Sequence, residues 1–379
     1  LINDDAVTLA KMAGLARGKL IYGDSSGNPA ALAIGSNTYV LTSDGTDAAW
    51  AAAASGAVSS YTNSTNNRII TSVDSSTING EANLTFDGST LSITGDLKTV
   101  TSGTSNFVAG VNAGNSIESG GNYNVAIGDE AGTAITTGDN NVLVGYAAGD
   151  ANTTGYDNVG IGYAALGATT TGYYNVAVGS TSLDANTDGI RNTAVGYGSL
   201  GTNSTGDNHT AVGYNALTAS TTADNNTAVG FNALKTNTTG TANTVMGHDA
   251  MGASTTAGNS VAIGYAAGVT TTTGSTNTTV GHHAFYYNTT GASNVAIGQA
   301  ALHRHTTGSN NIGIGVGSGQ DITTGTTNIG LGNNSLDALT TASHCIGIGQ
   351  AAQLVATTAT QNVSCLLYTS DAADDLLCV

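Results

Sequence analysis

Residues 226–242 read NTAVGFNALKTNTTGTA, and the seventeen residues before them, 209–225, read HTAVGYNALTASTTADN. The same pattern continues in both directions, with a glycine at every seventeenth position. The glycines in phase are Gly128, Gly145, Gly162, Gly179, Gly196, Gly213, Gly230, Gly247, Gly264, Gly281, Gly298, Gly315, Gly332 and Gly349. A period of this length over fourteen copies predicts a repeat protein in which each copy forms one structural unit.

Other positions of the unit are almost as constant. The residue before each glycine is Val, Ile, Leu or Met, the third before it is Val, Thr or Ile, and the residue between them is mostly Ala or Gly. Asn precedes this triplet in eleven of the fourteen copies, and His209, Ser260 and Cys345 replace it in the others. After the glycine come Ala or Ser at the third position, usually Leu at the fourth, then a Thr-Thr pair and a second Gly.

The triplet alternates branched and small side chains, which is the period of a strand and not of a helix. We therefore predict an all-β fold, a β-solenoid or β-roll of about fourteen coils, each with two short strands and two turns. At about 4.8 Å between hydrogen-bonded strands, fourteen coils would be roughly 65 Å long. The first Gly would permit a bend, the second would suit a turn with positive φ, and the Asn and Thr columns would form hydrogen-bonded ladders.

The alternation also sets two faces. If the branched aliphatic residues fill the interior, the Ala or Gly between them points outward and leaves a flat surface of small residues. Such a surface suits packing against identical chains, so we predict a homotrimer with the small residues near its axis. Aromatic residues such as Tyr146, Tyr163, Tyr214 and Phe231 would then lie at the strand ends.

The rest of the chain divides by composition. Residues 1–60 are predicted to form an N-terminal stem or attachment segment, with one short helix within residues 1–20 and a linker. Residues 61–121 are predicted to be a β-rich connector and cap, followed by the repeats at 122–361. The last residues, 365–379, resemble the translation of a sequencing adapter, and we expect them to be foreign to the native protein.

Composition excludes several function classes. Only 9% of the residues are charged and the net charge is −17, so no basic surface for nucleic acid is expected. No stretch reaches the roughly 18 apolar residues of a transmembrane helix, so membrane insertion is not expected either. The three cysteines give no disulfide or metal framework, and no acidic pair or Ser, His and Asp set recurs at a fixed place. We expect no enzyme activity, no cofactor and no metal site.

His303 and His305 are candidate metal ligands, because their spacing would put two imidazoles on one side of a strand. Both fall in the variable turn of the repeat, so we expect an exposed loop and not a metal site. His248 and His282 share one column but lie two coils apart, too far to share a metal. The string GIGVGSG at 313–319 consists of repeat glycines without a following helix or Lys, so it does not predict a phosphate loop.

Variable positions between the strands are expected to line the outside of the rod, where they can carry recognition. They include Tyr173, Tyr174, Tyr286 and Tyr287, whose rings would suit stacking on the sugars of a host surface glycan. The alternative, which we favour, is that these rings cover the edge of the core.

Two families resemble parts of the chain. Residues 18–50 (GKLIYGDSSGNPAALAIGSNTYVLTSDGTDAAW) and 81–95 (EANLTFDGSTLSITG) resemble stem sequences of bacteriophage tail fibres. The repeat is similar to the NSVAIG-type head repeats of trimeric autotransporter adhesins, which imply a left-handed β-roll in a trimer. The unit of 17 residues is longer than is usual in those adhesins.

These resemblances imply a structural fibre of a phage tail, extracellular on the virion. It would be a rigid trimeric shaft that presents or contributes to attachment to a host cell-surface glycan or protein. Its partners would be itself, a bacterial surface receptor and other tail proteins. The alternative is a bacterial surface adhesin of the trimeric autotransporter type. A glycan-degrading enzyme on a solenoid would need a reproducible acidic pair, which the repeats lack.

Overall fold

The structure is a computed structural model that describes residues 101–352 and 360–365, together with seven strands between residues 20 and 93. The chain divides into two compact units, residues 1–97 and residues 98–379. The helix expected within residues 1–20 lies outside the described residues, as does 366–379 of the predicted adapter segment.

The first unit contains short antiparallel strands. Two hairpin-like pairs are formed by β1 (Leu20–Gly23) with β2 (Pro29–Leu32) and by β3 (Tyr39–Ser43) with β4 (Ala48–Ala52). A three-stranded antiparallel sheet is formed by β5 (Arg68–Ser72), β6 (Ile78–Phe86) and β7 (Leu91–Ile93).

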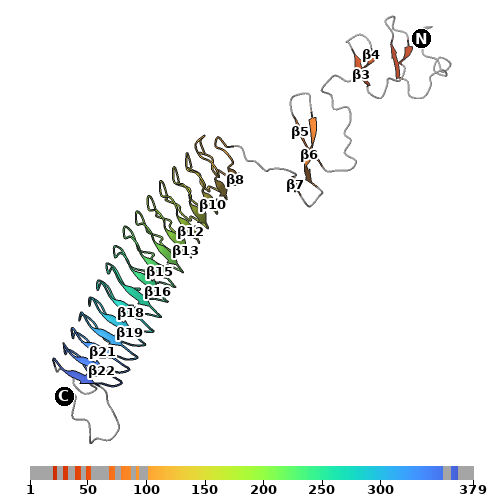
Figure 1. Ribbon diagram of the computed structural model, residues 1–379. Helices are drawn as coiled ribbons and strands as arrows, with labels where there is room; N and C mark the ends of the chain where they lie inside the picture. The colour runs from red at the N-terminus through yellow and green to blue at the C-terminus, as the bar shows by residue number, and fades with distance from the viewer. Residues whose placement is uncertain are drawn as a thin grey trace, which may run out of the picture. The chain divides into compact units, whose positions relative to one another are not determined.

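The second unit is a parallel β-solenoid, which confirms the predicted fold class. Sixteen strands form one sheet in sequence order, each paired in parallel with the next (Figure 1). They are β8 (Phe107–Ala109), β9 (Val125–Ile127), β10 (Val142–Val144), β11 (Val159–Ile161), β12 (Val176–Val178), β13 (Thr193–Val195), β14 (Thr210–Val212), β15 (Thr227–Val229), β16 (Thr244–Met246), β17 (Val261–Ile263), β18 (Thr278–Val280), β19 (Val295–Ile297), β20 (Ile312–Ile314), β21 (Ile329–Leu331), β22 (Ile346–Ile348) and β23 (Val363–Cys365). From β9 to β23 the paired residues are seventeen positions apart, as in Thr210 with Thr227.

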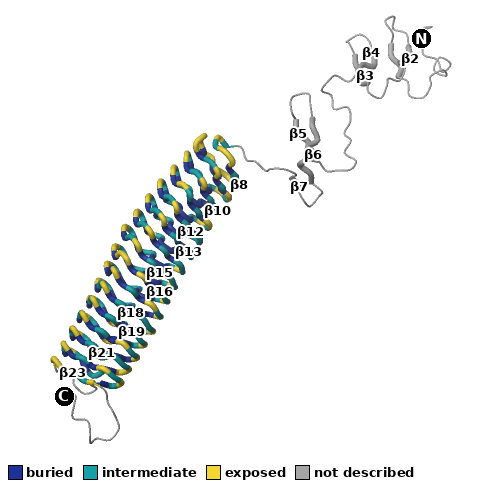
Figure 2. The backbone as a smooth tube through the Cα atoms, in the orientation of Figure 1, coloured by how far each residue is buried: buried dark blue, intermediate teal, exposed yellow. Residues whose placement is uncertain are grey.

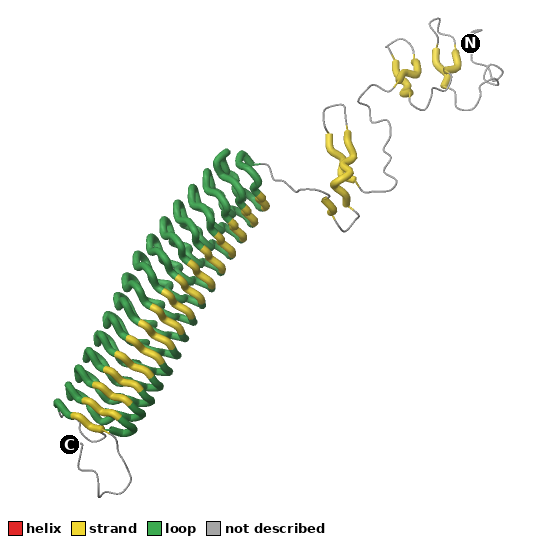
Figure 3. The backbone as a smooth tube through the Cα atoms, in the orientation of Figure 1, coloured by secondary structure: helices red, strands yellow, loops and turns green. Residues whose placement is uncertain are grey.

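Each coil holds one strand and not the two that the sequence suggested. The strands have three residues, and turns make up the rest of each coil. Figure 3 shows the strands along one side of the solenoid and turns around the remainder. The backbone conformation after the strand explains this. Positive φ recurs at the column glycine and again at the second and fourth residues beyond it, as at Gly213, Asn215 and Leu217. Extended backbone cannot continue through that alternation.

The side chains of the strand face opposite to our expectation. The middle residue points inward and is fully buried, as at Ala177, Ala194 and Ala211. The branched residues on either side are half-buried or exposed, and Ile161 and Ile263 keep about 40% and 38% of their surface. A three-residue strand that places its middle side chain inside must place the other two outside. Figure 2 shows the buried residues running along the inside of the stack.

The core is filled mainly from the turn. Leu at the fourth position after the glycine is buried in coil after coil, as at Leu200, Leu217 and Leu234. Where glycine takes this position, a neighbour supplies the missing volume. A Cβ added at Gly149 would lie 2.7 Å from a methyl carbon of Leu143, which replaces the usual Ala of the strand. The coils are therefore narrow, and close packing conserves the total volume.

The column glycines are required by both conformation and space. Gly213 has φ +138°, and a Cβ built there would lie 2.4 Å from the carbonyl oxygen of Gly230 in the next coil. The second glycine of the unit does not adopt the positive φ that we predicted for it. This explains why Ala takes its place at 223, 257 and 342.

The predicted ladders are confirmed. The Nδ2 of Asn141 donates to the carbonyl oxygen of Gly155 at 2.9 Å, and its backbone N–H donates to the Oδ1 of Asn124 at 2.9 Å. The same pair of bonds recurs at Asn158, Asn175 and Asn192. On the far side of the coil, Thr hydroxyls donate to the threonine carbonyl seventeen residues on, as from Thr238 to Thr255 at 3.0 Å. Each coil is thus bonded to its neighbours through main chain and side chains.

We predict that Gly213→Ala destabilises the solenoid by at least about 3 kcal/mol, because a side chain with this φ is strained and its Cβ meets backbone that cannot move aside. The matched control is Gly252→Ala. Gly252 has an ordinary φ, and its nearest neighbour would lie 3.3 Å from the new Cβ. Urea unfolding followed by circular dichroism measures both. Equal midpoints for the two variants would contradict the assignment.

Candidate interaction surface

The outer face of the sixteen-stranded sheet is apolar over much of its length. It carries two columns of side chains, the first and third residues of each strand. The first column consists mainly of Val, Thr and Ile, and the third mainly of Val and Ile. The exposed large apolar members of the third-residue column are Ile127, Ile161, Met246, Ile263, Ile314 and Ile348. An apolar surface of this kind is a candidate site of association.

A column of rings runs beside this face, at the residue after the column glycine in eight of the fourteen coils. From coil to coil, six rings stack without a break: Tyr197, Tyr214, Phe231, His248, Tyr265 and His282. Their centroids are 4.8 to 5.3 Å apart and neighbouring planes differ by 9° to 20°. His248 and His282 are separated by Tyr265, which confirms that they are too far apart to share a metal.

A separate shorter stack precedes it. Tyr146 and Tyr163 stack with centroids 5.7 Å apart and planes 13° apart. Ser180 occupies the next position in the column, between Tyr163 and Tyr197. The ring column is therefore interrupted by one residue that has no ring.

The predicted surface rings form two local clusters. Tyr173 stacks on Tyr156 at 4.7 Å, and Tyr174 meets both rings edge-on. Farther along, Tyr286 stacks on His303 at 5.3 Å, and Tyr287 meets the same imidazole edge-on. Tyr174 and Tyr287 are each about half exposed, at 49%. These rings stack on one another, so part of each ring face is already covered.

His283 joins the second cluster. Its ring lies 4.0 Å from that of His282, measured between centroids, and its carbonyl oxygen lies 3.1 Å from Nδ1 of His303. Burial and the two neighbouring imidazoles lower the pKa of His283. This packing favours the uncharged form of His283.

The prediction that His303 and His305 both lie in an exposed loop is wrong for His305. The two side chains point in opposite directions, and His305 is fully buried inside the coil. Its column holds Asn288 in the preceding coil, so the imidazole takes the place of a core amide. Its Nε2 lies 3.0 Å from Nδ2 of Asn311, and its Nδ1 has no hydrogen-bond partner among the described residues. Burial lowers the pKa of His305 to about 4.

His209 is a second buried imidazole that sequence reasoning did not separate from the others. It stands in the Asn ladder, where Nδ1 accepts from the backbone N–H of Asn226 at 3.2 Å and Nε2 donates to the carbonyl oxygen of Ala223 at 2.6 Å. Burial lowers its pKa. Its replacement of Asn, in a column that holds Asn in eleven of the fourteen coils, was the available signal, because a neutral side chain with one donor and one acceptor fits both bonds.

The carboxylates are not gathered into a site. Asp150, Asp184 and Asp337 share one turn column, and burial raises the pKa of each. Within the part of the chain that the structure describes, no group of three or more His, Cys, Asp or Glu side chains is placed to hold a metal. Residues 313–319 run from β20 into its turn, with no helix N-terminus after them.

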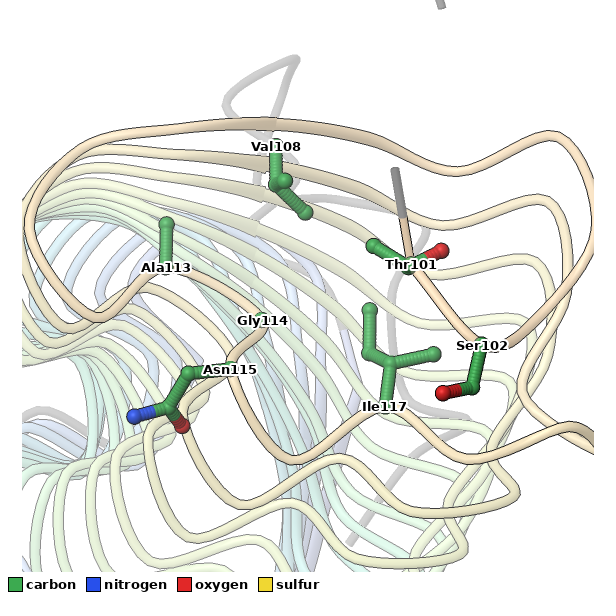
Figure 4. Close-up of a pocket in the computed structure, with 7 residues that line it drawn as sticks. All are labelled: Thr101, Ser102, Val108, Ala113, Gly114, Asn115 and Ile117. Atoms are coloured by element: carbon green, nitrogen blue, oxygen red, sulfur yellow. The ribbon is translucent and has the colours of Figure 1, made fainter. Parts of the chain in front are cut away.

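A hollow lies at the first coil of the stack (Figure 4). Val108, Ala113 and Ile117 form its apolar part, and Thr101 and Ser102 lie beside it. The same three apolar residues belong to, or pack on, the buried core. The hollow is thus the end of the core in the first coil and has no charged lining residue.

No helix among the described residues has the length and apolar character needed to cross a membrane. Comparison with known proteins found no matching family model, no matching curated protein and no matching solved structure. The candidate surface therefore rests on its own geometry.

We predict that acid weakens the solenoid through its two buried imidazoles. Both pKa values are lowered in the folded state, so unfolding takes up protons once the pH falls below about 6.5, the ordinary histidine value. Stability is complete above that pH and is lost as pH falls toward 4, by roughly 3 kcal/mol for His305 alone.

The check is a comparison of wild type with the double variant His209→Asn, His305→Asn, which places in each column a residue that other coils carry there. Urea midpoints are measured at pH 7 and pH 4.5. Carboxylates contribute alike to both proteins, so the difference between them isolates the histidines. An equal acid shift in both proteins would show that the imidazoles are not responsible.

Proposed function

We propose that this chain is the shaft of an extracellular attachment fibre, a rod that assembles with copies of itself and carries contacts to a bacterial surface. The observation that supports it most is the single parallel sheet of sixteen strands, extended coil by coil with ladders of Asn and Thr. Such a stack supplies length and stiffness.

The outer face of the sheet supports the proposed self-association. The two outward columns of Val, Ile and Thr would be covered by the same columns of other copies, with the axes of the rods side by side. A homotrimer is the assembly that the resemblance to adhesin heads implies. The packing surface differs from our first expectation, because branched residues and not small ones face outward.

The tail of a bacteriophage is the location we propose, on the resemblance of residues 18–50 and 81–95 to fibre stems. Other tail proteins and a host receptor, a surface glycan or protein, would then be the partners. A bacterial trimeric adhesin is the second candidate, favoured by residues 259–264, which read NSVAIG like the adhesin repeat. Neighbouring virion genes in the source genome would support the fibre. A membrane anchor encoded in the same gene would support the adhesin.

Charges placed on the outer face should prevent assembly. We predict that the triple variant Val195→Lys, Val212→Lys, Val229→Lys sediments as a single chain while the wild type sediments as a trimer, because three adjacent ammonium groups would be buried at the interface. The control triple variant Thr205→Lys, Thr222→Lys, Thr239→Lys adds the same charge to an exposed column on the Thr side of the coils and should leave the trimer intact. A wild type that sediments as one chain would overturn the trimer.

Attachment is tested separately. Fluorescently labelled wild-type chain is mixed with a panel of bacterial strains, washed and measured by flow cytometry. We expect retention on some strains and not on others, since a receptor is specific to its host. Retention on no strain, or equal retention on all of them and on inert beads, would contradict an attachment role.

A further inference from the structure

The interruption of the ring column at Ser180 has the form of a binding slot. The column residue is a ring in the two coils before it, Tyr146 and Tyr163, and in the six coils after it, beginning with Tyr197. We propose that the gap over Ser180 binds one pyranose ring of a neutral glycan, sandwiched between Tyr163 and Tyr197. This names the ligand class for the attachment role and rests on that proposed function.

The two tyrosines on either side of the gap, Tyr163 and Tyr197, form its walls and are more exposed than the other tyrosine and phenylalanine rings of the column. Tyr163 and Tyr197 keep 57% and 53% of their surface, more than any other tyrosine or phenylalanine of the column, whose values run from 43% to 50%. A ring inside a stack has both faces covered by its neighbours. Each wall of the gap has one covered face, against Tyr146 or Tyr214, and one bare face turned toward the other wall.

The dimensions leave room for one ring. Tyr163 and Tyr197 are two coils apart, which is about 9.6 Å at the usual spacing of strands. In the unbroken column the same interval holds one ring between two others, as Phe231 lies between Tyr214 and His248. A chair-shaped pyranose with apolar contacts of about 4.0 to 4.5 Å on each side fills roughly 8 to 9 Å. The slot therefore has room for a single pyranose between its walls.

The chemistry of the slot agrees with a sugar. Two tyrosine faces offer apolar contact to the C–H groups on both sides of a pyranose, and the Ser180 hydroxyl lies at the column position between them. Ser180 and Thr181 are half-buried, and the Thr181 hydroxyl donates to the carbonyl oxygen of Ser180 at 2.8 Å. The chain carries a net charge of −17, and Asp184 lies in the same coil. A neutral hexose is therefore favoured over a uronic acid, which would be repelled.

The test uses the full chain and saturation-transfer NMR with methyl β-D-glucopyranoside. Because the ring would be held between two walls, protons on both of its faces should receive saturation. Methyl β-D-glucuronide, the same ring with a carboxylate, should bind more weakly. Phenol serves as the flat-ring probe and should bind more weakly than the glucoside.

Three variants separate the slot from the remainder of the column. Ser180→Tyr completes the stack with the residue that neighbouring coils use, so it should abolish the glucoside signal without harm to folding. Tyr163→Ala removes one wall and should weaken binding about fivefold to tenfold. Tyr265→Ala, in the unbroken column, is the control and should bind as the wild type does.

The outcomes are distinct. Signals that persist in Ser180→Tyr, that come from one ring face alone, that are lost equally in Tyr265→Ala, or that are absent from the wild type would overturn the slot. Preferential binding of phenol would also overturn it, in favour of a flat ligand. Cell retention that is unchanged by Ser180→Tyr, with no glucoside signal, removes the slot and leaves the attachment role. Loss of the glucoside signal in Ser180→Tyr, with no cell retention by the wild type, supports the slot and removes the attachment role.

Discussion

The stability of the rod depends on the register of seventeen residues between coils. Backbone and Asn side chains bond each coil only to the next, so each coil depends on a neighbour with the same length. The first coil is one residue longer than the others and still keeps its bonded positions in register. The Nδ2 of Asn106 donates to a carbonyl fifteen residues on, at Gly121, where later coils span fourteen. The extra residue lies in the turn and leaves both ends of the bond in their columns.

The period, the strand and the ladders could be predicted from the sequence because each leaves a mark in every copy. The face of the strand that lies inside could not be predicted, since an alternation of branched and small residues defines two faces without saying which is inside. The volume inside the coil decides which face points inward. Leu at the fourth position already fills a narrow coil, so the strand can contribute only a small residue such as Ala211 or Gly160. Leu143 agrees with this reasoning, because the coil with Leu at the middle of its strand has Gly149 in its turn.

The candidate surface was predictable only in part for a related reason. The ring column is readable in the alignment of repeats, yet a ring in a stack exposes its edge and not its face. A ring face is exposed where the column stops. Predicting such a face requires knowing that successive coils stack in register. Likewise, residue type alone does not distinguish His303 from His305. The columns to which they belong separate them, since the column of His305 also holds Asn288, a buried polar residue.

A slot that exists once in a chain is a weak site by itself, because two ring contacts give only a small part of the free energy that a tight complex needs. An assembled fibre changes this. In the proposed assembly, copies that share one axis would hold identical slots at the same height, so a glycan surface would meet several of them at once and the second contact would form at a high effective concentration. The stiffness of the rod matters here. A flexible chain would lose that advantage to conformational entropy, whereas a stack of bonded coils keeps the slots at fixed positions. The repetition of the solenoid therefore suits it to attachment by many weak contacts.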